Sequence, residues 1–94
     1  MDIAVENDEK GRQFHAEVDG HRAHLDYLKQ KDGTWNLVHT EVDPALRGKG
    51  VGEALVRQAL DAARSAGVKV IPTCPFVKKF VEHHPEYGDR VAAL

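Results

Sequence analysis

The first half of the chain alternates between apolar and polar residues, which is the pattern of half-buried β-strands. Apolar side chains fall on every second position over much of residues 12–19 and again over residues 22–29. Asp19-Gly20 separates the two runs and favours a tight hairpin turn. The pattern predicts an antiparallel hairpin, preceded by a short strand over residues 3–6 and a polar loop over residues 7–11.

A fourth strand is predicted over residues 34–42, after a second turn at Lys31-Asp32-Gly33. Regular alternation assigns its side chains to two faces, one with Trp35, Leu37, His39 and Glu41 and the other with Val38 and Val42. Because both faces carry apolar residues, we expect this strand to lie in the interior of the sheet.

The second half of the chain changes to helical spacing. Apolar residues recur every three or four positions over residues 50–66, and Gly67 follows as a natural helix end. Residues 68–71 form a short apolar run that is typical of a buried parallel strand. A second helix is predicted to begin at Pro75, with Thr73 or Cys74 as its cap, and to end at His84-Pro85. The pattern assigns no element to residues 86–94, for which a helical turn is as compatible as any other structure.

These elements predict an α/β (α+β) domain that covers residues 1–94. Four antiparallel strands are followed by a helix, a parallel strand and a second helix. A right-handed crossover through the first helix makes the fifth strand parallel to the fourth, so the sheet is mixed.

The turn between the fourth strand and the first helix carries the clearest candidate chemistry. Asp43-Pro44 ends the strand, because proline cannot donate to a β-ladder. Arg47-Gly48-Lys49-Gly50-Val51-Gly52 follows, with three glycines in five positions and two cations. Backbone N–H groups in such a turn, together with the helix N-terminus, can bind a phosphate or pyrophosphate. The alternative is that the glycines only permit a tight strand-to-helix turn.

Arg47-Gly48-x-Gly50-x-Gly52 resembles the Arg/Gln-x-x-Gly-x-Gly/Ala signature of the GNAT-type N-acetyltransferases, and the whole chain resembles their short, single-domain branch. The resemblance implies that residues 47–52 bind the pyrophosphate of acetyl-coenzyme A as cosubstrate. It also implies that backbone groups near Glu41 and Val42 bind the pantetheine arm, and that the N–H of Val42 stabilises an oxyanion. The expected partner is an amine acceptor, either a small molecule or a protein amine.

Three side chains are candidates for catalysis. Cys74 stands at a helix N-terminus, where the helix dipole can lower the pKa of a thiol, although a buried core cysteine is the alternative. His39 and Glu41 lie two apart on the fourth strand, where some GNAT enzymes carry a base for the attacking amine. The resemblance implies that Cys74 lies near the acetyl group and contributes to cofactor binding.

The second helix departs from the pattern of larger GNAT enzymes. Cys74-x-x-Val77-x-x-Phe80-Val81 aligns with Asn-x-x-Ala-x-x-Leu-Tyr, so a valine stands where the tyrosine acid is usual. Cys74 could replace that acid or form an acetyl-cysteine, the thiolate could leave unaided, or catalysis could be weak. The alternatives to an enzyme are therefore a coenzyme A-binding module with little catalysis, or a binder of another phosphorylated ligand.

Composition narrows the possible partners and compartment. Thirteen basic and fifteen acidic residues give a net charge of −2, which favours neither nucleic acid nor a membrane surface. One cysteine forms no internal disulfide, and no signal peptide or membrane span is evident, so we expect the cytoplasm and a monomer or weak dimer. The six histidines lack the spacing of zinc ligands, and no Ser or Thr follows Lys49 as in a nucleotide P-loop. The sequence therefore predicts no metal.

Overall fold

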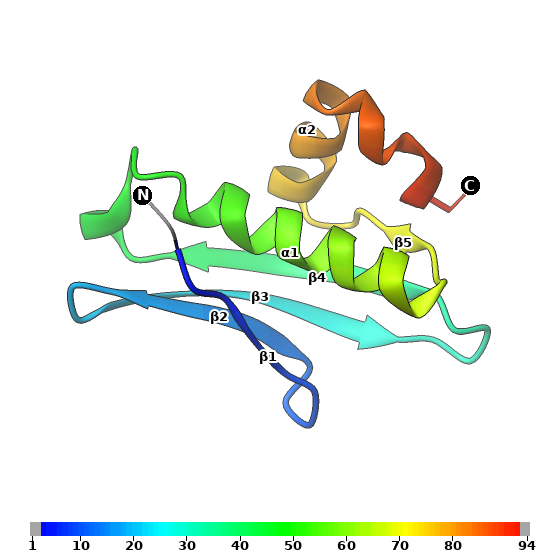
Figure 1. Cartoon of the computed structure of the whole chain (residues 1–94), viewed down its shortest axis with the longest axis horizontal. Coiled ribbons are helices and arrows are strands. Elements are labelled where there is room, and N and C mark those ends of the chain that lie inside the picture. Colours follow the sequence, from blue (N-terminus) through cyan, green and yellow to red (C-terminus); the bar gives the residue numbers. More distant parts are fainter. Residues whose placement is uncertain (1–2, 93–94) are drawn as a thin grey trace.

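A five-stranded mixed sheet forms one layer of the structure, a computed structural model that describes residues 3–92 (Figure 1). The strands lie in chain order and are β1 (Glu6–Asp8), β2 (Gln13–Val18), β3 (His21–Lys29), β4 (Trp35–Val42) and β5 (Val70–Ile71). The first four pair antiparallel, and β5 pairs parallel to β4. The predicted mixed sheet is confirmed.

Turn chemistry explains the two hairpins that follow β2 and β3. Asp19 and Gly20 both have positive φ, 52° and 79°, as the tight turn between right-twisted strands requires. In the second turn Gly33 has φ 91°, and the Thr34 N–H donates a 2.9 Å hydrogen bond to Asp32 Oδ1. Both turns lie where the sequence predicts them.

The first strand lies later in the chain than predicted. The sequence suggests residues 3–6, whereas β1 is Glu6–Asp8, with Glu6 opposite His15 and Asp8 opposite Gln13. All three residues of β1 are exposed, so no apolar alternation marks it. Backbone pairing with β2 and the 2.9 Å hydrogen bond from the Tyr27 hydroxyl to Asn7 Oδ1 hold it in place.

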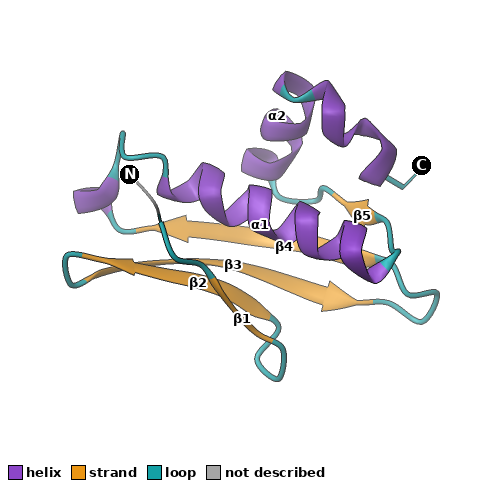
Figure 2. Cartoon of the chain, viewed as in Figure 1, coloured by secondary structure: helices purple, strands orange, loops and turns teal. Residues whose placement is uncertain are grey.

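Four helical segments pack beside the sheet (Figure 2). They are the 3₁₀ turn η1 (Pro44–Leu46), α1 (Val51–Ala66), α2 (Pro75–His83) and the 3₁₀ turn η2 (Pro85–Arg90). The long helix α1 contacts β2, β3 and β4 across one face of the sheet, and α2 contacts α1 and β4. Most of the apolar stripe of α1 is buried, and Gly67 ends the helix with φ 72°. No helix among the described residues is long and apolar enough to cross a membrane.

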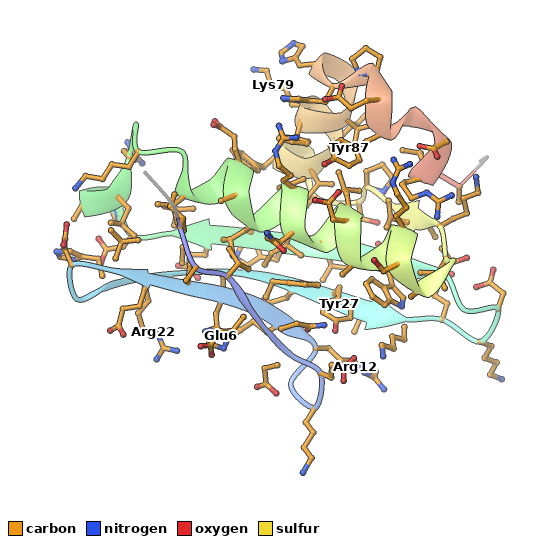
Figure 3. The ribbon with its side chains drawn as sticks, viewed as in Figure 1. Glu6, Arg12, Arg22, Tyr27, Lys79 and Tyr87 are labelled. Carbon is orange, nitrogen blue, oxygen red and sulfur yellow. The ribbon has the colours of Figure 1, made fainter. Side chains whose placement is uncertain are left out.

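The C-terminal segment is anchored to α1 by Tyr87 (Figure 3). The Tyr87 hydroxyl donates to Asp61 Oδ1 at 2.9 Å and accepts from Arg57 Nη1 at 3.4 Å. Val91 forms a bridge beside Val70, so the chain after η2 lies along β5. The tail that the sequence leaves unassigned thus begins with η2, and residues 93–94 lie outside the described residues.

A β-bulge interrupts β4 and corrects the predicted alternation. Tyr27 pairs with Leu37 and the adjacent Asp26 pairs with His39, so Val38 is an extra residue. Leu37 therefore faces the core under α1, whereas His39 faces the opposite side of the sheet. The prediction that Trp35 and Leu37 share a face with His39 and Glu41 is wrong for this reason.

Candidate functional site

The edge of β4 is open beyond the bulge. β4 pairs with β5 only at Trp35 and Asn36, and the next contact to that side is the 2.9 Å hydrogen bond from the Cys74 N–H to the Leu37 carbonyl. The Asp43 N–H donates to the Arg22 carbonyl of β3 at 3.1 Å. Because neighbouring residues direct their backbone groups to opposite edges, the N–H and C=O of Val42 face the open edge.

A capped 3₁₀ turn fixes the chain as it leaves β4. The Ala45 N–H donates to Asp43 Oδ1 at 2.9 Å, and His21 Nδ1 lies 3.0 Å from Asp43 Oδ2. These two hydrogen bonds, with that of Ala45 the stronger cause, lower the pKa of the Asp43 carboxyl. Pro44 occupies the first position of η1, and Leu46 is buried, so the turn is anchored at both ends.

Glycine is needed in the following turn for two different structural reasons. Gly48 and Gly50 both have φ 76°, a conformation that disfavours any side chain, and Gly50 is the N-cap of α1 without a side-chain cap. Gly52 has ordinary helical backbone, but a Cβ there would lie 2.9 Å from Phe76 Cζ and 3.4 Å from Val42 Cγ2. A side chain at this position would therefore displace the Phe76 ring from its place beside the first turn of α1.

The turn leaves backbone donors without partners. The N–H groups of Gly48, Gly50, Val51 and Gly52 donate to no other atom within residues 3–92. Unpaired N–H groups at a helix start, with the positive end of the helix dipole, attract an anion. The local geometry is therefore that of an anion site.

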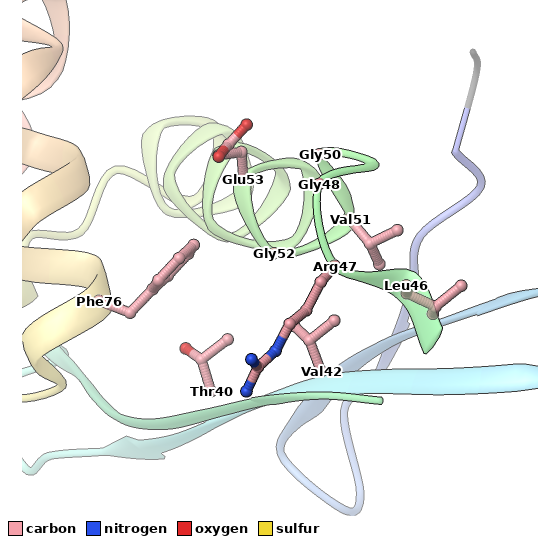
Figure 4. Close-up of a pocket in the computed structure, with 10 residues that line it drawn as sticks. All are labelled: Thr40, Val42, Leu46, Arg47, Gly48, Gly50, Val51, Gly52, Glu53 and Phe76. Atoms are coloured by element: carbon pink, nitrogen blue, oxygen red, sulfur yellow. The ribbon is translucent and has the colours of Figure 1, made fainter. Parts of the chain in front are cut away.

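These elements enclose a cavity of about 410 Å³ between β4, the turn and the start of α1 (Figure 4). It is lined by Thr40, Val42, Leu46, Arg47, Gly48, Gly50, Val51, Gly52, Glu53 and Phe76. Figure 4 shows the Arg47 side chain extending into it toward Thr40. Six of the residues predicted to bind the cofactor, Val42, Arg47, Gly48, Gly50, Val51 and Gly52, are thus brought together.

The other predicted site residues lie outside this lining. Lys49 points toward the β2–β3 hairpin, with Nζ 3.8 Å from Asp19 Oδ2. His39 and Glu41 share one face, as predicted, but it is the face opposite α1. There His24 bridges two carboxylates, with Nδ1 3.1 Å from Asp26 Oδ1 and Nε2 3.2 Å from Glu41 Oε2. No group of three or more His, Cys, Asp or Glu among residues 3–92 is arranged to hold a metal ion.

Of the two predicted caps of α2, Thr73 and Cys74, the structure has Cys74 as the N-cap. Cys74 is only 5% exposed. Its Sγ lies 3.5 Å from Thr40 Oγ1. Burial raises the pKa of the Cys74 thiol, but hydrogen bonds with the Thr40 hydroxyl and with backbone groups at the start of α2 outweigh burial, so the pKa lies below its ordinary value. Cys74 does not line the cavity itself; Thr40 lines it and also contacts the thiol.

Sequence reasoning missed four of the lining residues as site residues: Thr40, Leu46, Glu53 and Phe76. Thr40 turns toward the cavity only because of the bulge at Val38. Phe76 is an apolar residue of α2, yet it is 41% exposed at the cavity wall. The available sequence signal for Phe76 is its position two residues after Cys74, in the first turn of the predicted second helix.

Comparison with known proteins gives consistent results over nearly the whole chain. A family model described as GCN5-related N-acetyl-transferase matches residues 13–91. Protein NATD1 of Xenopus tropicalis is 38% identical over 93 residues, covering 95% of this chain and 85% of that protein. Human protein NATD1 is 36% identical over 93 residues, which cover 95% of this chain and 82% of that protein.

Solved structures share the fold. The solution structure of a GCN5-like protein from Staphylococcus aureus superposes with a TM-score of 0.76 at 28% identity, covering 97% of this chain and 89% of that one. A Trypanosoma brucei acetyltransferase superposes with a TM-score of 0.51 at 22% identity, over 90% and 67% of the two chains, and shows the fold alone. The family match over residues 13–91 and the NATD1 relatives together establish that this chain belongs to the GCN5-related N-acetyltransferase family.

Proposed function

We propose that this protein, as one domain over residues 1–94, transfers the acetyl group of acetyl-coenzyme A to a primary amine. The observation that carries the proposal is the cluster of unpaired N–H groups at Gly48–Gly52, which faces a cavity of about 410 Å³ beside the open edge of β4. Unpaired N–H groups at a helix start would bind a pyrophosphate. The open strand edge would pair with the amides of a long arm attached to that pyrophosphate. Acetyl-coenzyme A, when bound, supplies the thioester that an amine attacks.

The residues of the cavity fit this ligand. The N–H groups of the turn and the Arg47 guanidinium would hold the pyrophosphate, because both are hydrogen-bond donors at the cavity. The backbone N–H and C=O of Val42 at the open edge would pair with the amides of the arm. Glu41 pairs its backbone with His24 of β3, so its contribution would come from the side chain.

Proton transfer would involve residues on both faces of β4. An ammonium must lose a proton before it attacks, and Glu41, oriented by His24, or His39 could accept it on the face away from α1. The acceptor amine would then approach from that uncovered face. On the α1 side, the Cys74 thiol could donate a proton through the Thr40 hydroxyl, which lies in the cavity wall. An acetyl-cysteine route would require Cys74 to become exposed.

The positions of the three candidate catalytic residues also favour a second function. Cys74 is buried outside the cavity, and His39 and Glu41 lie on the opposite face of β4. A protein that binds coenzyme A with little or no transfer would need only the turn and the edge of β4.

A binding and turnover experiment separates these functions. Calorimetric titration compares the affinity for acetyl-coenzyme A with the affinity for adenine nucleotides. Acetyl transfer is measured separately, as the release of free coenzyme A thiol in the presence of a panel of small amines and lysine peptides. Binding with turnover supports the enzyme, and binding without turnover for any amine supports the second function. Preference for a nucleotide that lacks pantetheine would overturn both.

A further inference from the structure

The face of the sheet opposite α1 carries two adjoining hollows over β2 and β3. The first, called here the arginine hollow, measures about 270 Å³ and is lined by Gln13, His15, Arg22, Ala23 and His24. The second measures about 210 Å³ and is lined by Ala4, Glu6, His15, Ala16, Glu17 and Arg22. The helical segments of residues 3–92 lie on the other side of the sheet (Figure 2), so a small molecule can reach both hollows.

Arg22 is the cation that the two hollows share. It projects from this face of the sheet (Figure 3), and its side chain makes no hydrogen bond or ion pair within residues 3–92. Glu17 lies directly opposite Arg22 on β2, yet the two side chains form no ion pair, and Glu6 lies 3.8 Å from His15 instead. The planar guanidinium of arginine binds a carboxylate through two parallel hydrogen bonds. Arg22 is therefore available to receive a carboxylate from a ligand.

The other side chains of the arginine hollow do not repel an anion. None of its five lining residues carries a carboxylate. The carboxylate of Asp26, farther along β3, is already engaged, because Gln13 Nε2 donates to its Oδ1 at 2.9 Å and His24 Nδ1 lies 3.1 Å from the same oxygen. An anionic group in this hollow would therefore lie beside Arg22.

His24 links the arginine hollow to Glu41. It lines the hollow, and its Nε2 lies 3.2 Å from Glu41 Oε2 on β4. Glu41 is paired with His24, and Arg22 is two residues before His24 on β3, so Arg22 is a diagonal neighbour of Glu41. Diagonal neighbours in an antiparallel pair are about 7–8 Å apart. A molecule only a few bonds long can thus present one group to Arg22 and another to Glu41.

We propose that the amine acceptor is a small amino acid, whose carboxylate binds Arg22 in the arginine hollow while its amine lies beside Glu41. The inference rests on the proposed function and names the class of acceptor for it. The ammonium end is attracted to the Glu41 carboxylate and the carboxylate end to the Arg22 guanidinium, so the two ends match opposite charges on β4 and β3. An alkylamine lacks the group that Arg22 would hold.

The test compares ε-aminocaproate with hexylamine, in which a methyl group replaces the carboxylate. With acetyl-coenzyme A saturating, thiol release should give a KM for ε-aminocaproate at least about tenfold below that for hexylamine, because a charge-assisted hydrogen bond discriminates by that factor or more. Lysine and lysinamide form a second such pair and should show the same order. Arg22→Ala should raise the KM for ε-aminocaproate to that for hexylamine, with kcat for both and the KM for hexylamine unchanged.

Arg12→Ala is the matched control, because Arg12 is also an exposed arginine and lines neither hollow. It should keep the preference of the parent. A second measurement needs no turnover: when the isotope-labelled parent is titrated with ε-aminocaproate, the NMR amide signals of Gln13 and His24 should shift, and in Arg22→Ala they should not. Shifts confined to other parts of the chain would overturn the inference.

The kinetic outcomes separate this inference from the proposed function. Equal KM values for ε-aminocaproate and hexylamine in the parent would overturn the inference and leave the proposed function intact, and so would an equal rise for both acceptors in Arg22→Ala. Absence of transfer to every amine would overturn the proposed function as an enzyme and this inference with it.

Discussion

Replacing Gly52 by alanine would test the cavity at the one glycine of the turn that is required for space. Its φ is ordinary, but the added Cβ would lie 2.9 Å from Phe76 Cζ, 3.2 Å from Phe76 Cε1 and 3.4 Å from Val42 Cγ2. Carbon atoms in favourable contact are about 3.5–4.0 Å apart, so the Phe76 ring must retreat by roughly 0.6 Å or more. The substitution therefore changes the part of the cavity wall that Phe76 forms.

We expect the fold to tolerate this change while ligand binding does not. The clashing atoms are the far end of a side chain that is 41% exposed, so the ring can move at small cost. Alanine is also favoured over glycine within helices by up to about 1 kcal/mol. The melting temperature of the free protein should therefore stay within about 4 °C of the parent. The new methyl group lies in the cavity lining, and the Kd for coenzyme A should rise at least tenfold, about 1.4 kcal/mol.

Gly67→Ala gives the opposite outcome and serves as the control. Gly67 has φ 72°, and a Cβ there would meet nothing within 4 Å, so the only penalty is the left-handed conformation. That penalty is about 1–2 kcal/mol and should lower the melting temperature by roughly 4 °C or more. Its Kd for coenzyme A should not change. Parent-like binding by Gly52→Ala would refute the assignment of the cavity, and so would an equal loss of binding in both variants.

Three further predictions follow from the contacts described above. Arg47→Ala should weaken the binding of coenzyme A, measured by calorimetry, by at least about tenfold and by more than Lys49→Ala does. The reason is that Arg47 extends into the cavity whereas Lys49 points toward Asp19, and a larger loss of affinity in Lys49→Ala would contradict it. Because the pKa of the Cys74 thiol is lowered in the folded chain, the free energy of unfolding should rise relative to that of Cys74→Ser as the pH passes upward through the folded pKa. The gain should be complete above the pKa of the unfolded thiol, and denaturant titrations at several pH values that show a constant difference would contradict it. Tyr87→Phe removes the hydroxyl that bridges Asp61 and Arg57 and should lower stability by about 1 kcal/mol with coenzyme A affinity unchanged, as denaturation and calorimetry would show.

Local signals explain why most of the fold was predictable. The hairpins follow from Asp19-Gly20 and Gly33, where turn geometry requires positive φ. The helix α1 follows from its apolar stripe and from Gly67, and α2 from the cap and proline at its start. β1 could not be predicted in register, because its three exposed residues carry no burial pattern and its position depends on pairing with β2.

The candidate site was predictable only where it is contiguous in sequence. The glycine turn is a local motif, and its residues gather as the motif implies. Phe76 comes from a segment far from the turn in the chain and meets it only through the packing of α2 against α1. Thr40 lies on the strand before the turn, but its orientation depends on the bulge, which the alternation does not predict. The burial of Cys74 likewise depends on where α2 begins relative to Leu37, which no local pattern fixes.

The extra residue in β4 links the failed alternation to the cavity. With strict alternation, His39 and Glu41 would lie beneath α1, where their polar groups would need partners that the apolar core does not supply. The bulge at Val38 places them on the uncovered face and turns Thr40 and Val42 toward α1. A bulge also bends a strand and increases its twist, and the pairing of β4 with β5 ends at Asn36, two residues before it. A regular strand could continue that pairing and occupy the backbone groups of Val42, so the same residue that breaks the sequence pattern leaves the edge of β4 open for a ligand.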